Sequence, residues 1–204
     1  LLVNTVLKPY SYVVPLDRFP QETTVYDQAG KLVKVVNRTP LNEIIPKGFS
    51  AVREGKRYMN WRNVKPATLC YVEALDGGDP ARKVDFRDEL FSWEAPFTGN
   101  PVSLAKTTLR FAGVTWGNDQ TAILNDNWAE TRMTNTYLIN PSVPGEKPKV
   151  IFSRNQQDVY SDPGRFETRE NQFGKRTLAI EKDKLFLIGN GFTPEGQFPF
   201  IDVF

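Results

Sequence analysis

The sequence predicts an all-β protein that forms part of a β-propeller, and three observations lead to this prediction. Helical periodicity is almost absent from the 204 residues. Short runs rich in Val, Ile, Tyr, Phe, Thr and Leu recur along the whole chain and are typical of strands. Turn-forming segments such as DGGDP, WGND and SDPG separate these runs, and the stretches 57–80 and 110–132 repeat one pattern.

The repeated pattern centres on two tryptophans, Trp61 and Trp116, which lie 55 positions apart. Each is expected to end a strand, and a short polar turn then leads into a second apolar run, at 67–74 or 121–129. A period of about 40–50 residues with about four strands per unit is typical of propeller blades. The repeat therefore favours a propeller over a β-sandwich.

Taken in order, the strand patterns predict about four blades of four antiparallel strands within a single domain, 1–204. In the first, the strands are expected at 1–7, 10–15, 23–28 and 31–36, the last two joined as a hairpin by the Gly-containing turn DQAG. The segment 37–55, which mixes Pro, Gly and charged residues, is interpreted as an interblade loop. The four predicted blades cover about 1–36, 57–108, 109–154 and 165–204.

Composition excludes several classes of function. The 26 Lys and Arg residues balance 24 Asp and Glu residues, and the two signs are interleaved, so neither nucleic acid nor a membrane surface is an expected partner. There is no histidine, which excludes Ser-His-Asp and Cys-His catalysis within this chain and most catalytic zinc sites. The single cysteine, Cys70, is expected to be a small buried side chain. We expect no metal, no cofactor and no catalytic residue here.

The clustered Asp and Glu residues do not occupy every second position, as the ligands of a calcium-binding loop do. We interpret them as solvated turn residues. They are Asp76, Asp79, Asp85, Asp88, Glu89, Asp158 and Asp162.

The best candidates for binding are an aromatic residue and three arginines. Trp128 and Arg132 lie in a polar stretch between two strands, where a guanidinium group could receive an anionic group. Arg165 and Arg169 lie on the first strand of the last predicted blade. The alternative is structural: Trp128 packs on a neighbouring blade, and Arg132 pairs with a nearby carboxylate.

Several segments, in order, resemble the propeller portion of the prolyl oligopeptidase family of serine peptidases, and more narrowly its glutamyl endopeptidase branch. The segments cover nearly the whole chain and are specific in combination: KPYSYVVPLDRFPQETTVYDQAGKLVKVV, NWRNVKPATLCYVEALDGGD, WGNDQTAILNDNWAETRMTNTYLI, DVYSDPGRF and GNGFTPEGQFPFIDVF.

The resemblance implies a parent enzyme whose propeller caps the active site and restricts entry to peptides, with a Ser-Asp-His triad on a C-terminal α/β-hydrolase domain. That domain is absent from this chain, since neither histidine nor a G-x-S-x-G segment occurs. The expected partners are therefore this hydrolase domain and peptide substrates, and Arg132 is the first candidate for binding a glutamate side chain. The chain opens at Leu1, so we expect it to be a part of a longer protein. Bacterial relatives of this kind favour a periplasmic or exported location, with the plastid as the alternative.

Two other interpretations stay open from the sequence. One is a free-standing propeller that binds a protein or glycan partner. The other is a propeller enzyme that works with carboxylates alone, which would need a convergent acid pair. No such pair stands out in the sequence.

Overall fold

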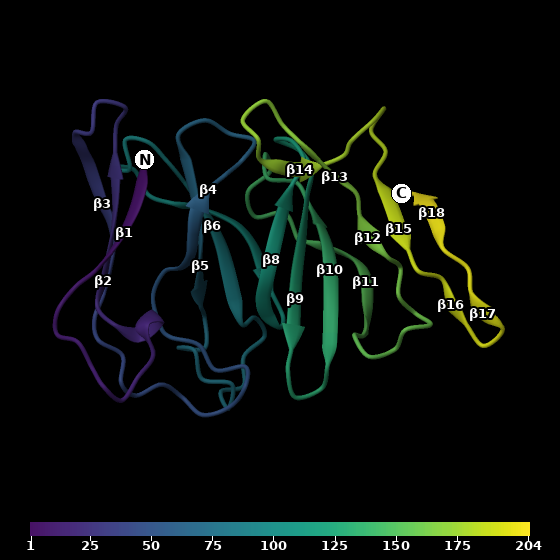
Figure 1. Cartoon of the computed structure of the whole chain (residues 1–204), viewed down its shortest axis with the longest axis horizontal. Coiled ribbons are helices and arrows are strands. Elements are labelled where there is room, and N and C mark those ends of the chain that lie inside the picture. Colours follow the sequence, from purple (N-terminus) through teal and green to yellow (C-terminus); the bar gives the residue numbers. More distant parts are fainter. The chain divides into compact units, whose positions relative to one another are not determined.

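The computed structural model describes residues 1–204, and it consists of antiparallel β-sheets with a single short 3-10 helix (Figure 1). The chain divides into two compact units. Unit 1 comprises Leu1–Arg62 and Ala67–Ser103, and unit 2 comprises Asn63–Pro66 and Leu104–Phe204. No helix of the structure is long and apolar enough to cross a membrane.

The first sheet of unit 1 has three strands in the order β1-β2-β3. The predicted hairpin is confirmed: the Asp27 carboxylate accepts hydrogen bonds from the backbone N–H groups of Ala29 and Lys31, each 2.9 Å long, and Gly30 has a φ of +78°. Glycine reaches this left-handed conformation without the strain that a side chain would cause. The elements are β1 (Leu2–Val6), the 3-10 helix η1 (Leu16–Arg18), β2 (Gln21–Tyr26) and β3 (Leu32–Thr39).

The strand expected at 10–15 does not form, so this first sheet has three strands and not four. Pro9 directly precedes the segment and Pro15 is its last residue, and proline has no N–H group to donate to a neighbouring strand. The apolar run instead leads as an irregular segment into η1.

The second sheet has four strands in the order β4-β5-β6-β7, and β4 ends at Trp61 as expected. The residues between β3 and β4, from Pro40 to Lys56, contain no helix or strand. The boundary between the two units falls within β7, after Ser103. The strands are β4 (Arg57–Trp61), β5 (Thr68–Ala74), β6 (Asp88–Glu94) and β7 (Val102–Thr107).

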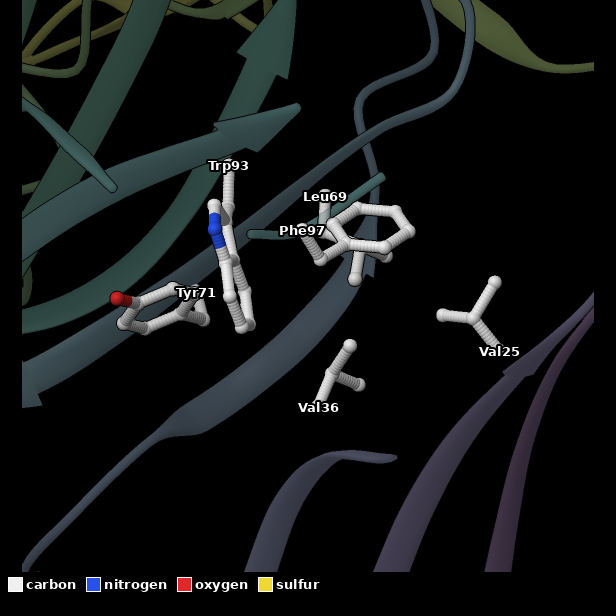
Figure 2. Packing of buried hydrophobic residues seen from close by; sticks show 6 residues of the cluster. All are labelled: Val25, Val36, Leu69, Tyr71, Trp93 and Phe97. Carbon is white, nitrogen blue, oxygen red and sulfur yellow. The ribbon is translucent and has the colours of Figure 1, made fainter. Parts of the chain in front are cut away.

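The hydrophobic core of unit 1 lies between these two sheets. Figure 2 shows Val25 and Val36, from β2 and β3, facing the side chains of Leu69 and Phe97. The rings of Trp93 and Phe97 meet edge to face with their centroids 5.5 Å apart, a favoured geometry for aromatic pairs. The two sheets of unit 1 therefore pack face to face. The buried cluster contains Val25, Val36, Leu69, Tyr71, Trp93 and Phe97.

Unit 2 contains a second four-stranded antiparallel sheet, in the order β11-β10-β9-β8. Its first strand ends at Trp116, which is buried, and a turn leads to β9 as the repeat predicted. The strands are β8 (Arg110–Trp116), β9 (Ala122–Trp128), β10 (Met133–Ile139) and β11 (Lys149–Asn155).

The last part of unit 2 does not form one four-stranded sheet. Three small sheets, ordered β12-β15-β18, β13-β14 and β16-β17, take its place. Gly189, at the end of β15, allows a close approach, since a side chain there would collide with the Phe200 ring of β18. The strands are β12 (Arg165–Phe166), β13 (Thr168–Glu170), β14 (Arg176–Leu178), β15 (Phe186–Gly189), β16 (Phe192–Thr193), β17 (Gly196–Gln197) and β18 (Phe200–Val203).

The all-β prediction is confirmed, with several antiparallel sheets. Both segments around the repeated tryptophans lie in four-stranded sheets. A closed propeller is not seen, so the propeller and its count of four blades stay predictions.

Candidate functional site

A cleft of about 550 Å³ in unit 1 brings together four arginines from four separate segments. Arg18 belongs to η1, Arg38 to β3, Arg53 to the connection 40–56, and Arg82 to the connection between β5 and β6. We call this site, defined by Arg18, Arg38, Arg53 and Arg82, the arginine cleft. A second cavity of about 430 Å³ shares Arg18 and Arg53 with it, so the two adjoin.

One wall of the arginine cleft is fixed by the turn that follows β5. The carboxylate of Asp76 is fully buried and accepts hydrogen bonds of 2.9 Å from the Gly78 N–H and from Nη1 of Arg87. The Gly78 carbonyl in turn accepts a 3.1 Å hydrogen bond from the Val52 N–H in the connection 40–56. A Cβ atom on residue 78 would lie 1.9 Å from the Val52 carbonyl oxygen, so only glycine permits this approach.

A second part of the lining is held by the backbone of η1. The Arg18 carbonyl oxygen accepts a 2.9 Å hydrogen bond from the Asn42 N–H. This bond attaches the start of the connection 40–56 to the 3-10 helix. A long irregular segment is thus anchored at two places, and its position is defined although it contains no strand.

Arg53 lies half-buried in the cleft, and it donates hydrogen bonds to carbonyl oxygens and not to a carboxylate. Its guanidinium group donates to the carbonyls of Glu54 (3.2 Å) and Lys56 (2.7 Å). Burial lowers the pKa of Arg53, the neighbouring Arg57 lowers it further, and Asp17 opposes both effects. Arginine keeps its charge at neutral pH even so, because its ordinary pKa is above 12. The cleft therefore holds a partly desolvated cation.

Three carboxylates also line the cleft: Asp17, Glu54 and Asp79. Asp79 uses one carboxylate oxygen within its own turn, where it accepts a 2.9 Å hydrogen bond from the Ala81 N–H. Asp17 and Glu54 are exposed to solvent. The lining thus carries both signs of charge, with the arginines in the majority.

The structure places Trp128 and Arg132 in unit 2, at the hairpin between β9 and β10. Trp128 is half-buried at the end of β9, and the Cζ atom of Arg110 lies 5.9 Å from the centroid of its ring. Arg132 is exposed at the end of the turn with a φ of +59°, and its carbonyl oxygen accepts a 2.8 Å hydrogen bond from the Gln156 N–H. The two residues therefore share one hairpin.

Arg165 and Arg169 are exposed on β12 and β13, two strands of different small sheets. Nη2 of Arg169 donates a 3.3 Å hydrogen bond to the Ile180 carbonyl. These strands follow Gly164, whose φ of +81° turns the chain into β12.

Arg132 and Arg169 do not converge on one site. The strand next to β13 is β14, which packs against β8, and a Cβ atom on Gly117 would lie 3.2 Å from the Leu178 side chain. The β9–β10 turn lies at the other end of the same sheet (Figure 1). A seven-residue strand such as β9 is roughly 20 Å long, so the two ends are far apart.

Two carboxylates that we expected to be solvated are buried instead. Asp76 and Asp88 are fully buried, and each pairs with an arginine, Arg87 and Arg57 respectively. Burial of a carboxylate is tolerated only when a partner compensates the lost hydration. The expectation was wrong because these arginines are not recognisable as partners in the sequence.

Sequence reasoning missed the arginine cleft altogether. Its arginines come from a 3-10 helix, a strand and two irregular connections, so no local periodicity relates them. The composition of 37–55 predicts a loop and gives no indication of a binding site. The DGGD segment is the one local sign of the cleft, because two successive glycines suggest that two backbone segments approach each other closely there.

The arginine cleft differs in its chemistry from two buried reactive groups of the chain, Cys70 and Asp126. The thiol of Cys70 is buried, and burial raises its pKa to about 11, so it is not a nucleophile at neutral pH. The carboxylate of Asp126 is also buried within a closed hydrogen-bond network. The arginine cleft, in contrast, opens to solvent and presents cations to an anionic group.

Two curated plant proteins are similar to the whole of this chain. Each bears the name "Probable glutamyl endopeptidase, chloroplastic": one from Oryza sativa subsp. japonica, 38% identical over 211 residues, and one from Arabidopsis thaliana, 39% identical over 212 residues. The alignment covers 100% of this chain and 22% of each relative. This chain is similar to one part of a larger peptidase-named protein.

No protein-family model matches the chain. No solved structure matches it either. The chain spans about a fifth of the length of the curated relatives that it matches.

Proposed function

We propose that this chain is a non-catalytic region of a serine peptidase, and that it restricts and orients peptide substrates. The observation that carries the proposal is the full-length similarity to 22% of two proteins named as glutamyl endopeptidases. The absence of histidine from the chain supports it, because the catalytic triad must then lie elsewhere in the parent protein.

We further propose that the peptidase belongs to the prolyl oligopeptidase family and that this chain is a part of its β-propeller. The two four-stranded antiparallel sheets, each containing one of the repeated tryptophans, support this assignment. Its partner would be the α/β-hydrolase domain of the same polypeptide, and its ligands would be peptides.

For the cellular location, we propose the plastid. Both relatives carry "chloroplastic" in their names, which fits the plastid alternative. The periplasmic expectation has no support in these relatives.

The proposal is tested on the longer protein that contains this chain. We expect it to cleave after Glu in a short peptide, and to cleave the matching Gln peptide at least tenfold more slowly, since a cation that binds this side chain interacts more strongly with a carboxylate than with a neutral amide. A tightly folded protein with exposed Glu residues should resist cleavage, whereas its unfolded form should be cut. Equal cleavage of the folded and unfolded forms would contradict the restricting role.

Arg132 is the first of the sequence-derived candidates for glutamate binding. The proposal is that its exposed guanidinium group, next to Trp128, receives the substrate carboxylate. In the longer protein, Arg132→Ala would then reduce the preference for Glu over Gln, and Arg165→Ala and Arg169→Ala test the other two positions. If a variant keeps the preference for Glu over Gln, the residue that it replaces does not bind the substrate carboxylate.

A further inference from the structure

We propose that the arginine cleft of unit 1 binds an acidic peptide segment, whose carboxylates pair with Arg18, Arg53 and Arg82. Only the choice of a peptide as the ligand rests on the proposed function. The site itself rests on the geometry and charge of the cleft.

The cations in the cleft are available to a ligand. The guanidinium group of Arg53 donates only to backbone carbonyls, and the side chains of Arg18 and Arg82 form no ion pair with a carboxylate. Guanidinium groups pair with carboxylates through two parallel hydrogen bonds, and such bonds are stronger where water is partly excluded. Arg18 and Arg53 are half-buried and meet this condition.

Arg38 is the exception among the four arginines. Its Nε atom already donates to the Glu22 carboxylate at 2.6 Å, with 71% of the Arg38 side chain exposed. We therefore assign it no direct role in binding the ligand.

The size of the cleft suits a peptide segment. A volume of about 550 Å³ lies within the range of roughly 300–1,000 Å³ that ligand pockets occupy. The adjoining cavity of about 430 Å³ continues the site past Arg53. Apolar side chains of Phe19, Ile45 and Val52 line the walls between the charges and can contact the aliphatic part of a glutamate or its neighbours.

The carboxylates of the lining favour a peptide over a simple anion. A small inorganic anion would meet Asp17 and Glu54 as well as the arginines, and the like charges would repel it. A peptide can direct its backbone N–H groups to these carboxylates while its own acidic side chains contact the arginines. The mixed charge of the cleft thus matches a ligand that has both donors and acceptors.

The cleft is also ordered before a ligand arrives. The hydrogen bonds from Val52 to Gly78 and from Asn42 to Arg18 hold both parts of the lining in place. Binding then avoids much of the entropy cost of ordering loops.

The test is a titration of the 204-residue chain into a fluorescein-labelled peptide of alternating Glu and Ala, followed by fluorescence anisotropy. The same peptide with Gln in place of Glu is the matched ligand control. We expect the Glu peptide to bind, the Gln peptide to bind at least tenfold more weakly, and added salt to weaken the interaction. Equal binding of the two peptides would overturn the proposal.

The variants Arg18→Gln, Arg53→Gln and Arg82→Gln should each lower the affinity for the Glu peptide about tenfold. Lys83→Gln is the control variant, because it removes an equal charge one residue from Arg82 and does not line the cleft. Circular dichroism checks that each variant is folded. A loss for Lys83→Gln as large as that for Arg82→Gln would show general charge attraction and would contradict a defined site.

Inorganic phosphate serves as the competitor. Displacement of the peptide by phosphate at concentrations near the peptide dissociation constant would identify a small-anion site and would overturn the peptide assignment. Lys147→Gln, at an exposed position of unit 2 outside both candidate sites, should leave binding unchanged. This experiment measures binding alone. A longer protein without peptidase activity would therefore contradict the proposed function but not the binding of an acidic peptide in the arginine cleft.

Discussion

Arg57 on β4 and Asp88 on β6 form an ion pair, with Nη2 and Oδ1 2.5 Å apart, across the intervening strand β5. The two side chains are only 6% and 1% exposed. The pair therefore links two strands that are not hydrogen-bonded to each other, beside the cavity that adjoins the arginine cleft. It adds a buried charge interaction to the hydrogen bonds that join the strands of this sheet.

Removing one partner of this pair should destabilise the chain strongly. Asp88→Ala leaves the Arg57 charge buried without its carboxylate, and we expect the free energy of unfolding to fall by about 3–5 kcal/mol. Urea denaturation followed by tryptophan fluorescence measures the change. The exposed pair of Arg38 and Glu22 is the control, since Glu22→Ala should cost no more than about 1 kcal/mol. Similar losses for the two variants would contradict this account.

A glycine at residue 78 is required by the close approach of two backbones. Gly78 has a φ of +75°, and a Cβ atom there would lie 1.9 Å from the Val52 carbonyl oxygen. Gly78→Ala should therefore cost backbone strain of about 1–2 kcal/mol and a further 1–3 kcal/mol or so for displacing the connection 40–56. Differential scanning calorimetry gives the change in stability.

Gly30→Ala is the matched control for this prediction. Gly30 has nearly the same φ, +78°, but a Cβ atom on this residue would have no other atom within 4 Å. The loss of stability caused by Gly30→Ala should therefore come from backbone strain alone. In addition, Gly78→Ala but not Gly30→Ala should weaken the binding of the acidic peptide, because only Gly78 shapes the arginine cleft. Equal effects on stability would argue against the Val52 contact.

The strands around the repeated tryptophans could be predicted because their signals are local. A short run that contains aromatic residues and ends at Trp61 or Trp116, followed by polar turn residues, predicts a strand and a turn without reference to the rest of the chain. The hairpin at Asp27 to Lys31 is equally local, since the Asp27 carboxylate and Gly30 define it.

What could not be predicted depends on contacts between distant segments. Asp88 resembles any turn carboxylate in the sequence, and its burial depends on Arg57, which lies 31 residues earlier. The arginine cleft likewise forms only when η1, β3 and two connections meet. The segment 10–15 has the composition of a strand, but Pro9 before it and Pro15 at its end lack the N–H groups that strand pairing uses, and no strand forms.

The buried thiol of Cys70 should react slowly with alkylating reagents in the folded chain. Burial raises its pKa to about 11, and its Sγ donates a 3.5 Å hydrogen bond to the Asn60 carbonyl, so little thiolate is present near pH 8. We expect iodoacetamide to label it at least about a hundredfold more slowly than in the chain unfolded in guanidinium, where the pKa of a thiol is about 8.5. A double variant, Cys70→Ala with Ala29→Cys in the exposed turn, provides the reactive folded control. Equal labelling rates for Cys70 in the two states would contradict its burial.

The buried carboxylate of Asp126 should make stability depend on pH in a defined direction. Burial raises its pKa, although hydrogen bonds from the Leu109 N–H and from the Tyr137 hydroxyl (2.7 Å) oppose this rise. The folded chain thus holds the Asp126 proton more tightly than the unfolded chain, whose aspartate has a pKa of about 3.9. Relative to Asp126→Asn, the free energy of unfolding of the unsubstituted chain should fall as pH rises from about 4 through the raised native pKa. Tyr137→Phe removes a bond to the charged carboxylate and should move this fall to higher pH. Urea denaturation at a series of pH values measures all three chains, and parallel profiles would show that Asp126 does not titrate in this range.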